Sequence, residues 1–259
     1  PLAMRGVYFL QTCVAAPDFQ KQMFEGLTAP RPGVISVLCK RNEEEQAAFQ
    51  SRAERAVRSR AFPMCLYDPD RAHRFGMCFD LSANPAPDTL WTTETLSGQN
   101  AQGQPIEVEE PFTFAHFAAS EAEFAAEFTD PPAIADHLIP MTDYLGFSRR
   151  QRVGKLPFIS LVGKDGSIVR KVASPVIALQ CSDRLHLWHT LQEISGMDNP
   201  HVNTTRAALQ NECAAQQQAL KESLQQEMEK DAARREQAAV ATAVRKLVVH
   251  LTGIDPPNS

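Results

Sequence analysis

The first eighty residues alternate short β-rich runs with amphipathic helical patterns, and this alternation limits the possible folds more than any other feature of the sequence. The run Gly6 to Gln11 is rich in β-forming residues. Phe19, Met23 and Leu27 follow at a spacing of four, as on one face of a helix. The next run, 34–38, is apolar and β-branched, which is typical of a strand covered on both faces of a parallel sheet. The sequence therefore predicts a βαβ unit.

A second helix and a third strand are expected to extend this unit. Asn42 precedes three glutamates, and Glu45 stands at the spacing of a capping box, so we expect the helix to begin after Asn42. Arginines crowd its other end, where they complement the helix dipole. The apolar run that ends at Asp68 and Pro69 predicts the third strand. Residues 1–80 are thus expected to form the last strands and helices of an open parallel α/β sheet.

The rest of the chain is expected to form a separate, smaller α+β unit followed by a helical tail. Residues 81–110 are rich in Ser, Asn, Pro, Thr and Gly, which predicts a linker. The accessory unit is expected over 111–200, with a helix from Ser120 to Pro131 and a β-hairpin over 156–174 that turns at Lys164 to Gly166. After Pro175 an amphipathic helix is expected to end at Gly196. Its predicted buried face consists of Ile177, Cys181, Leu185, Trp188 and Leu191.

The tail, residues 201–259, carries a long helical pattern with Asn203 as its expected N-cap and Gly253 as its expected end. Its apolar residues do not keep a strict heptad through every position. They are Leu209, Cys213, Leu220, Leu224 and Met228. We therefore expect a helical hairpin, or a helix that lies on the body of the protein, rather than a long coiled coil.

Charge and cysteine content exclude several classes of protein. The net charge of −5 argues against a nucleic-acid-binding surface, and no stretch approaches the apolar length of a membrane span. The 6 cysteines include no CxxC pair and no spacing typical of zinc sites, so we expect buried core thiols in a cytoplasmic protein. Because the chain begins with Pro1 and enters a strand pattern within a few residues, we expect its natural N-terminus to lie upstream.

Two groups of residues suggest chemistry. Cys39 ends a predicted strand, at the edge of the sheet where open α/β folds bind ligands, and Lys40 and Arg41 make its surroundings positive. His186 and His189 lie three residues apart with Asp183 nearby, which is the composition of a general base and its carboxylate partner. The alternative for the second group is surface histidines on an amphipathic helix.

The segment Ala56 to Asp70 resembles the pyruvate:ferredoxin and related 2-oxoacid:ferredoxin oxidoreductases, in which a helix leads into an aromatic-Pro-apolar strand that closes on Tyr, Asp and Pro. Phe62, Pro63, Tyr67 and Asp68 are among the matching residues. The order of the upstream elements also agrees. The resemblance covers about one third of the chain and corresponds to the C-terminal part of the thiamine-diphosphate-binding domain.

This resemblance implies oxidative decarboxylation of pyruvate or a related 2-oxoacid on thiamine diphosphate and Mg²⁺, acyl transfer to coenzyme A, and electron transfer through [4Fe-4S] clusters to ferredoxin or flavodoxin. It implies that Cys39 is a cluster ligand that binds iron, provided that the loop at 29–33 is shortened; a buried structural thiol is the alternative. The family's Mg²⁺ signature and paired cysteines do not occur in this chain. The resemblance therefore implies a fragment that is inactive alone and works with the remainder of its polypeptide or with other subunits, as a homo-oligomer.

Two other functions are compatible with the sequence. In the first, the chain is a non-catalytic interaction or scaffold protein, and the β-hairpin, the helix that bears Trp188 and the tail form a docking surface. In the second, a stand-alone hydrolase uses Cys39 with a histidine. The sequence names neither the oxoacid nor the electron acceptor.

Overall fold

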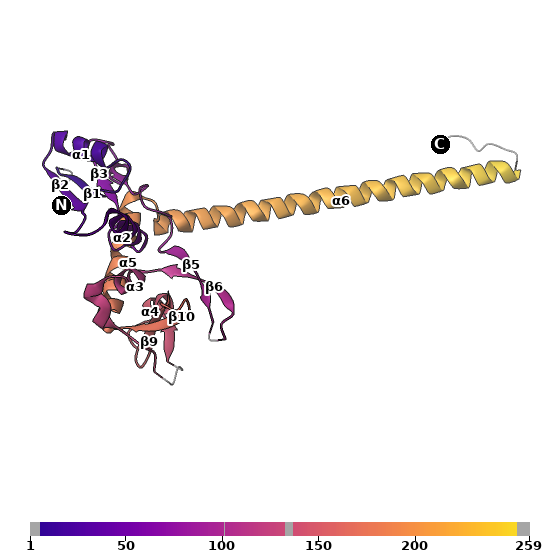
Figure 1. Cartoon of the computed structure of the whole chain (residues 1–259). Coiled ribbons are helices and arrows are strands. Elements are labelled where there is room, and N and C mark those ends of the chain that lie inside the picture. Colours follow the sequence, from indigo (N-terminus) through magenta and orange to yellow (C-terminus); the bar gives the residue numbers. More distant parts are fainter. Residues whose placement is uncertain (1–5, 101, 133–136, 253–259) are drawn as a thin grey trace. The chain divides into compact units, whose positions relative to one another are not determined.

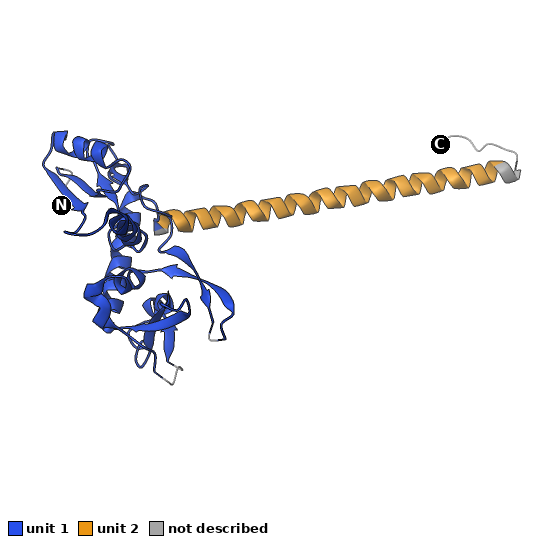
Figure 2. Cartoon of the chain, viewed as in Figure 1, with its two compact units in different colours: residues 1–199 blue, residues 200–259 orange. Residues whose placement is uncertain are grey.

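The computed structural model describes residues 6–100, 102–132 and 137–252. The chain divides into two units, residues 1–199 and 200–259, which Figure 2 shows in blue and orange. Among the described residues, the first unit contains helices and three small sheets, and the second contains one long helix. The predicted mixture of helices and sheets is therefore confirmed.

The first sheet contains the predicted βαβ unit. Its strand order is β2-β1-β3-β4, and β1 (Tyr8–Cys13) runs parallel to β2 (Gly33–Leu38). The crossover helix α1 (Phe19–Thr28) connects these two strands (Figure 1). The remaining strands, β3 (Cys65–Tyr67) and β4 (Phe79–Asp80), complete the sheet, with the short 3₁₀ helix η1 (Phe75–Cys78) between them.

The sheet is mixed rather than mostly parallel, which corrects the expectation for residues 1–80. Strand β3 pairs antiparallel with β1, and β4 pairs antiparallel with β3. The preceding helix, α2 (Gln46–Arg58), ends in a reversal: Arg60 adopts a left-handed conformation with φ of 59°, and the Phe62 N–H donates to the Ala56 carbonyl. Such an ending turns the chain back on the helix, and the chain then enters β3 opposite in direction to β1.

Helix α2 begins at Gln46 and not directly after Asn42, so the predicted N-cap is wrong. The Glu44 carboxylate accepts hydrogen bonds from the Arg41 backbone N–H at 2.9 Å and from Arg52 Nε at 2.7 Å. These charge-assisted bonds hold the segment before the helix in a turn of its own. The glutamates that suggested a first helical turn therefore lie outside the helix.

The second sheet contains the predicted β-hairpin. Its strand order is β7-β10-β9-β8, and β9 (Leu156–Val162) pairs antiparallel with β10 (Ile168–Ala173). Gly166 has a φ of 79° in the turn, and Asp165 accepts from the Ser167 N–H, as the sequence of the turn predicted. The outer strands are β7 (Phe128–Thr129) and β8 (Leu138–Pro140).

Residues 81–110, which were expected to form a linker, instead contain most of a second β-hairpin, between β5 (Thr92–Gln99) and β6 (Pro105–Phe112). Burial alternates along β5, so only Thr92 and Leu96 are fully buried in that strand. A β-carbon on Gly98 would lie 2.7 Å from Ile168 Cγ1, which shows how closely β5 approaches β10. These strands are poor in apolar residues because one face is solvated, and such segments resemble loops in composition.

Three shorter helices surround the second sheet. They are α3 (Phe114–Ala119), the 3₁₀ helix η2 (Ala122–Glu127) and α4 (Met141–Gly146). The helix expected from Ser120 to Pro131 is not formed, because α3 ends at Ala119 and the chain continues through η2 into β7.

Helix α5 (Pro175–Ser195) joins the first sheet, which contains β1, and the second sheet, which contains β9, into one compact unit. Its predicted C-terminal cap is confirmed, because Gly196 adopts a left-handed conformation. At the other end, the Ile177 N–H donates to the Ser174 hydroxyl, which caps the N-terminus. Ile177 lies in the core formed with α3, β9 and β10, whereas Trp188 lies in the core formed with β3, η1 and β4. Because one helix contributes to both cores, residues 1–199 form a single unit and not two domains separated by a linker.

The tail forms one continuous helix, α6 (Pro200–Thr252), of 53 residues, so the predicted helical hairpin is wrong. The sequence from His201 to Thr252 contains no glycine or proline that would end a helix. Asn203 lies inside this helix, and the expected end at Gly253 lies outside the described residues. Among the helices in the described part of the chain, none has the length and apolar character needed to cross a bilayer.

Candidate functional site

Cys39 follows β2 directly and is exposed, so it is not the buried structural thiol that was the alternative to a cluster ligand. Its thiol donates to the Val37 carbonyl at 3.6 Å. A [4Fe-4S] cluster takes four thiolate ligands. Among the described residues, no group of three or more His, Cys, Asp or Glu side chains is arranged to hold a metal. These residues do not fit a cluster by themselves, and the iron-binding role of Cys39 stays a prediction.

The remaining cysteines divide by burial. Cys13, Cys65, Cys78 and Cys181 are buried, as expected of core thiols, whereas Cys213 on α6 is exposed. Burial raises the pKa of Cys65 and of Cys181 to about 12, and it also raises the pKa of Cys13. A thiol with a raised pKa is protonated at neutral pH and reacts slowly.

We expect two of the 6 cysteines to react with a maleimide in the native protein. Cys39 and Cys213 are exposed, and the four buried thiols become accessible only on unfolding. Intact mass measured after brief alkylation checks this, and the variants Cys39→Ser and Cys213→Ser should each lose one adduct. More than two adducts on the native protein would contradict the burial described above.

The proposed histidine base is not assembled. Asp183 and His186 are exposed and His189 is half-buried on α5, and among the described contacts no hydrogen bond or ion pair joins these three side chains. Trp188, which was expected to contribute to a docking surface, is fully buried. Its indole N–H donates to the Thr89 carbonyl at 2.8 Å. That part of the docking hypothesis is wrong, because the predicted apolar face of α5 packs into the core.

Arg60 is fully buried, which the sequence did not indicate. Its guanidinium donates to the carbonyls of Ala86 at 2.8 Å and of Thr89 and Leu90 at 3.3 Å, and it lies 4.0 Å from the ring centre of Trp188. Burial lowers its pKa to about 10, so the group stays charged at neutral pH. Nε and Nη2 make these hydrogen bonds, whereas Nη1 is buried without a hydrogen-bond partner among the described contacts, and the guanidinium group lies over the Trp188 ring. Arg60 thus attaches the segment 86–90 to the end of α2 and to α5.

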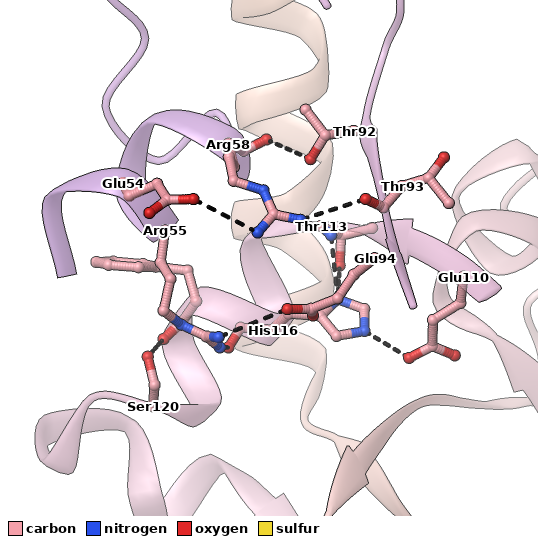
Figure 3. Close-up of polar contacts among 11 residues, drawn as sticks. Glu54, Arg55, Arg58, Thr92, Thr93, Glu94, Glu110, Thr113, His116 and Ser120 are labelled. Atoms are coloured by element: carbon pink, nitrogen blue, oxygen red, sulfur yellow. Dashed lines mark hydrogen bonds and ion pairs between the residues drawn. The ribbon is translucent and has the colours of Figure 1, made fainter. Parts of the chain in front are cut away.

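A polar network connects α2, β5, β6 and α3 (Figure 3). At its centre, His116 and Thr113 form a capping box for α3, in which the Thr113 N–H donates to His116 Nδ1 at 3.0 Å. Because Nδ1 accepts this bond, the proton lies on Nε2, which donates to the Glu110 carboxylate at 2.7 Å. The same carboxylate oxygen accepts from the Ser160 N–H at 3.0 Å, which connects the network to β9.

These bonds lower the pKa of Glu110. Burial is the largest single effect and raises the pKa, but the interactions of the carboxylate with His116 and Ser160 together outweigh burial. Both ring nitrogens of His116 are engaged, so the imidazole has no free nitrogen with which to act as a base. The geometry indicates a structural role for this pair.

Two arginines of α2 complete the network, as Figure 3 shows. Arg55 donates to the His116 carbonyl at 3.0 Å, and Arg58 donates to the Thr93 carbonyl at 3.2 Å. Both guanidinium groups lie 4.9 Å from the ring centre of Phe112. The arginines that the sequence placed on a solvated helix end therefore bind the β5–β6 hairpin to α2.

A cleft of about 680 Å³ opens beside the carboxyl end of β1. Cys13, Asp18 and residues of α2 such as Gln50 line it. This is the edge of the sheet where a ligand was expected, but Cys13 rather than Cys39 faces it. The Cys13 thiol is buried with a raised pKa, so it is not an activated nucleophile.

The long helix α6 carries an exposed apolar stripe. We define the stripe as Val202, Leu209, Cys213, Leu220, Leu224 and Met228. Its leucines are 52% to 62% exposed. At 3.6 residues per turn, all six residues lie within an arc of about 100°. Spacings of seven and four make a repeat of eleven residues rather than a heptad, so the stripe does not follow a heptad pattern.

A second apolar group lies further along the same helix. Val240, Val244 and Leu247 are exposed, and the helical period places them on about the opposite side from the stripe. The charged residues Asp231 and Arg235 end the stripe on its own side.

Comparisons of the chain with protein-family models, with curated proteins and with solved structures found no match.

Proposed function

We propose that this chain is an interaction protein that assembles with a second copy of itself through the stripe on α6. The observation that supports this is the stripe itself, which aligns six side chains along one side of a helix. Burying a leucine side chain contributes roughly 1.5–3 kcal/mol relative to leaving it in water. An exposed row of apolar side chains along one side of a helix is typical of a binding surface.

A second copy fits this surface better than an unrelated partner. Side chains that recur at spacings of seven and four match another helix with the same repeat, because knobs of one helix need holes at the same intervals on its partner. Two copies supply identical intervals. Assembly of two chains through α6 makes the protein a scaffold that holds two α/β units together.

The full chain is therefore expected to be a dimer at micromolar concentration in sedimentation equilibrium. The variant Leu224→Glu places a charge in the stripe, and we expect it to weaken dimerisation at least roughly 100-fold, because a buried unpaired charge is unfavourable by several kcal/mol. Val244→Glu is the matched control, since Val244 is 54% exposed on the same helix but on the other side. That variant should remain dimeric.

Two outcomes would refute this function. The first is a wild-type chain that remains monomeric at 100 micromolar, a concentration on the order of the dissociation constants of weak dimers. Such a result would show that the stripe does not mediate self-association. Equal dissociation by Leu224→Glu and Val244→Glu would show that the stripe is not the interface. Circular dichroism of each variant tests whether α6 itself stays helical.

The oxidoreductase function stays a prediction that depends on the resemblance of residues 56–70 to the 2-oxoacid:ferredoxin oxidoreductases. It requires cofactors and ligands from outside this chain. Anaerobic purification of the full-length parent protein tests it. Brown colour and bound thiamine diphosphate are the expected result, and a colourless, cofactor-free protein would end this hypothesis.

A further inference from the structure

From the same stripe we infer the geometry of the dimer, an inference that depends on the proposed function: the two α6 helices pair antiparallel and overlap over residues 200–233. The centre of the overlap then lies between Gln216 and Gln217. This arrangement places Leu209 of one copy opposite Leu224 of the other, and Cys213 opposite Leu220. Each apolar residue in the middle of the stripe thus meets another one.

The charges on the stripe favour this direction. Arg206 lies within the same arc as the apolar residues, as do Asp231 and Arg235. In a parallel, in-register pair, each of these three residues would face its own copy, and like charges directly opposite are unfavourable. In the antiparallel pair, Arg206 lies opposite Glu227, which is a complementary contact that occurs twice.

The residues at the ends of the overlap are also compatible with the antiparallel arrangement. Asp231 of one copy lies opposite Val202, in the first turn of the other helix, and a carboxylate near a helix N-terminus is stabilised by the helix dipole. Arg235 lies beyond the overlap and remains in water. The change of apolar face after Met228 coincides with the end of the overlap, because residues beyond 233 no longer contact the partner.

Disulfide trapping distinguishes the two directions. All variants carry Cys39→Ser, which removes the other exposed thiol. The first has no other change, the second adds Leu220→Cys, and the third adds both Leu220→Cys and Cys213→Ser. In the antiparallel pair the two Cys213 residues are offset by seven positions, about 10 Å along the axis, which exceeds the reach of a disulfide.

We expect rapid, nearly complete covalent dimer on mild oxidation of the second variant alone, because only there does a thiol lie opposite another thiol. Cross-linking of all three variants would show a parallel pair and overturn this inference, while self-association through α6 would stand. A protein that sediments as a monomer and cross-links in none of the variants would overturn both this inference and the proposed function. Sedimentation of the reduced second variant shows whether Leu220→Cys still dimerises.

A charge exchange provides an independent test. Glu227→Arg puts two arginines opposite each other at both ends of the overlap, and we expect the dimer dissociation constant to rise roughly tenfold at low salt. The double variant Arg206→Glu with Glu227→Arg restores opposite charges and should recover wild-type affinity. Glu229→Arg, on the far side of the helix, is the control and should change affinity little. Failure of the double variant to recover affinity would contradict the antiparallel register.

Discussion

Replacing Trp188 by alanine is expected to lower the free energy of unfolding by about 3–5 kcal/mol, which is the usual effect of removing a fully buried tryptophan. Trp188 lies in the core that α5 shares with the first sheet, so the change opens a cavity there. It also removes the aromatic face over Arg60 and the shortest of the hydrogen bonds that the Thr89 carbonyl accepts. Urea unfolding measures the loss, at one fixed protein concentration because the proposed dimerisation would add stability.

The neighbouring residue provides the control for this prediction. Leu187 is 39% exposed on the same helix, and Leu187→Ala should cost less than about 1 kcal/mol. If Trp188→Ala does not fold, Trp188→Phe keeps an aromatic ring but loses the hydrogen bond, and we expect it to cost about 1–2 kcal/mol. A stability loss no larger for Trp188→Ala than for Leu187→Ala would show that α5 does not join the two sheets through this residue.

Removing the Glu110 carboxylate is the second change with a large expected effect. Glu110→Ala leaves the His116 Nε2–H and the Ser160 N–H without an acceptor. A buried donor without a partner costs about 1–3 kcal/mol, so we expect a loss of roughly 3 kcal/mol for the two together. Urea unfolding at pH 7 measures it. Glu109→Gln, at the exposed neighbouring position, should leave stability unchanged.

The same carboxylate predicts how stability depends on pH. Its folded pKa lies below the ordinary value of 4.5, so the charged form stabilises the fold above that pH, and its contribution is lost as the pH falls through the folded pKa. Glu110→Gln should therefore be less stable than wild type at neutral pH, and the difference should shrink below pH 4.5. A difference that stays constant from pH 7 to about pH 3 would contradict the depressed pKa.

Several parts of the fold were predictable from short stretches of sequence. These parts depend on residues that lie close together in the sequence. They are the βαβ unit, the turn at Asp165 and Gly166, and the caps of α5 at Ser174 and Gly196. Side-chain period, turn chemistry and capping act over a few residues, so they can be recognised without knowledge of the rest of the chain. The helical character of the tail was predictable for the same reason.

The stripe on α6 was also encoded locally, but a search for heptads could not find it. Val202, Cys213 and Leu224 recur every eleven residues, a period close to three full helical turns. The unbroken length of α6 follows from the absence of glycine and proline between His201 and Thr252. The eleven-residue period is therefore a local signal of the stripe in the sequence itself.

What only the tertiary structure decided are the features that depend on distant partners. The direction of β3, the hairpin within 81–112 and the burial of Arg60 depend on contacts between residues far apart in the sequence. Arg58 and Arg60 lie two residues apart in the same sequence surroundings. Arg58 is nevertheless partly exposed to solvent, whereas Arg60 is buried against Trp188. By itself, the sequence determined the βαβ unit, the β9–β10 hairpin, helix α5 and the helical character of the tail, because these elements depend on local patterns. Which faces become buried, and hence that residues 1–199 form one unit, was decided by long-range packing around α5.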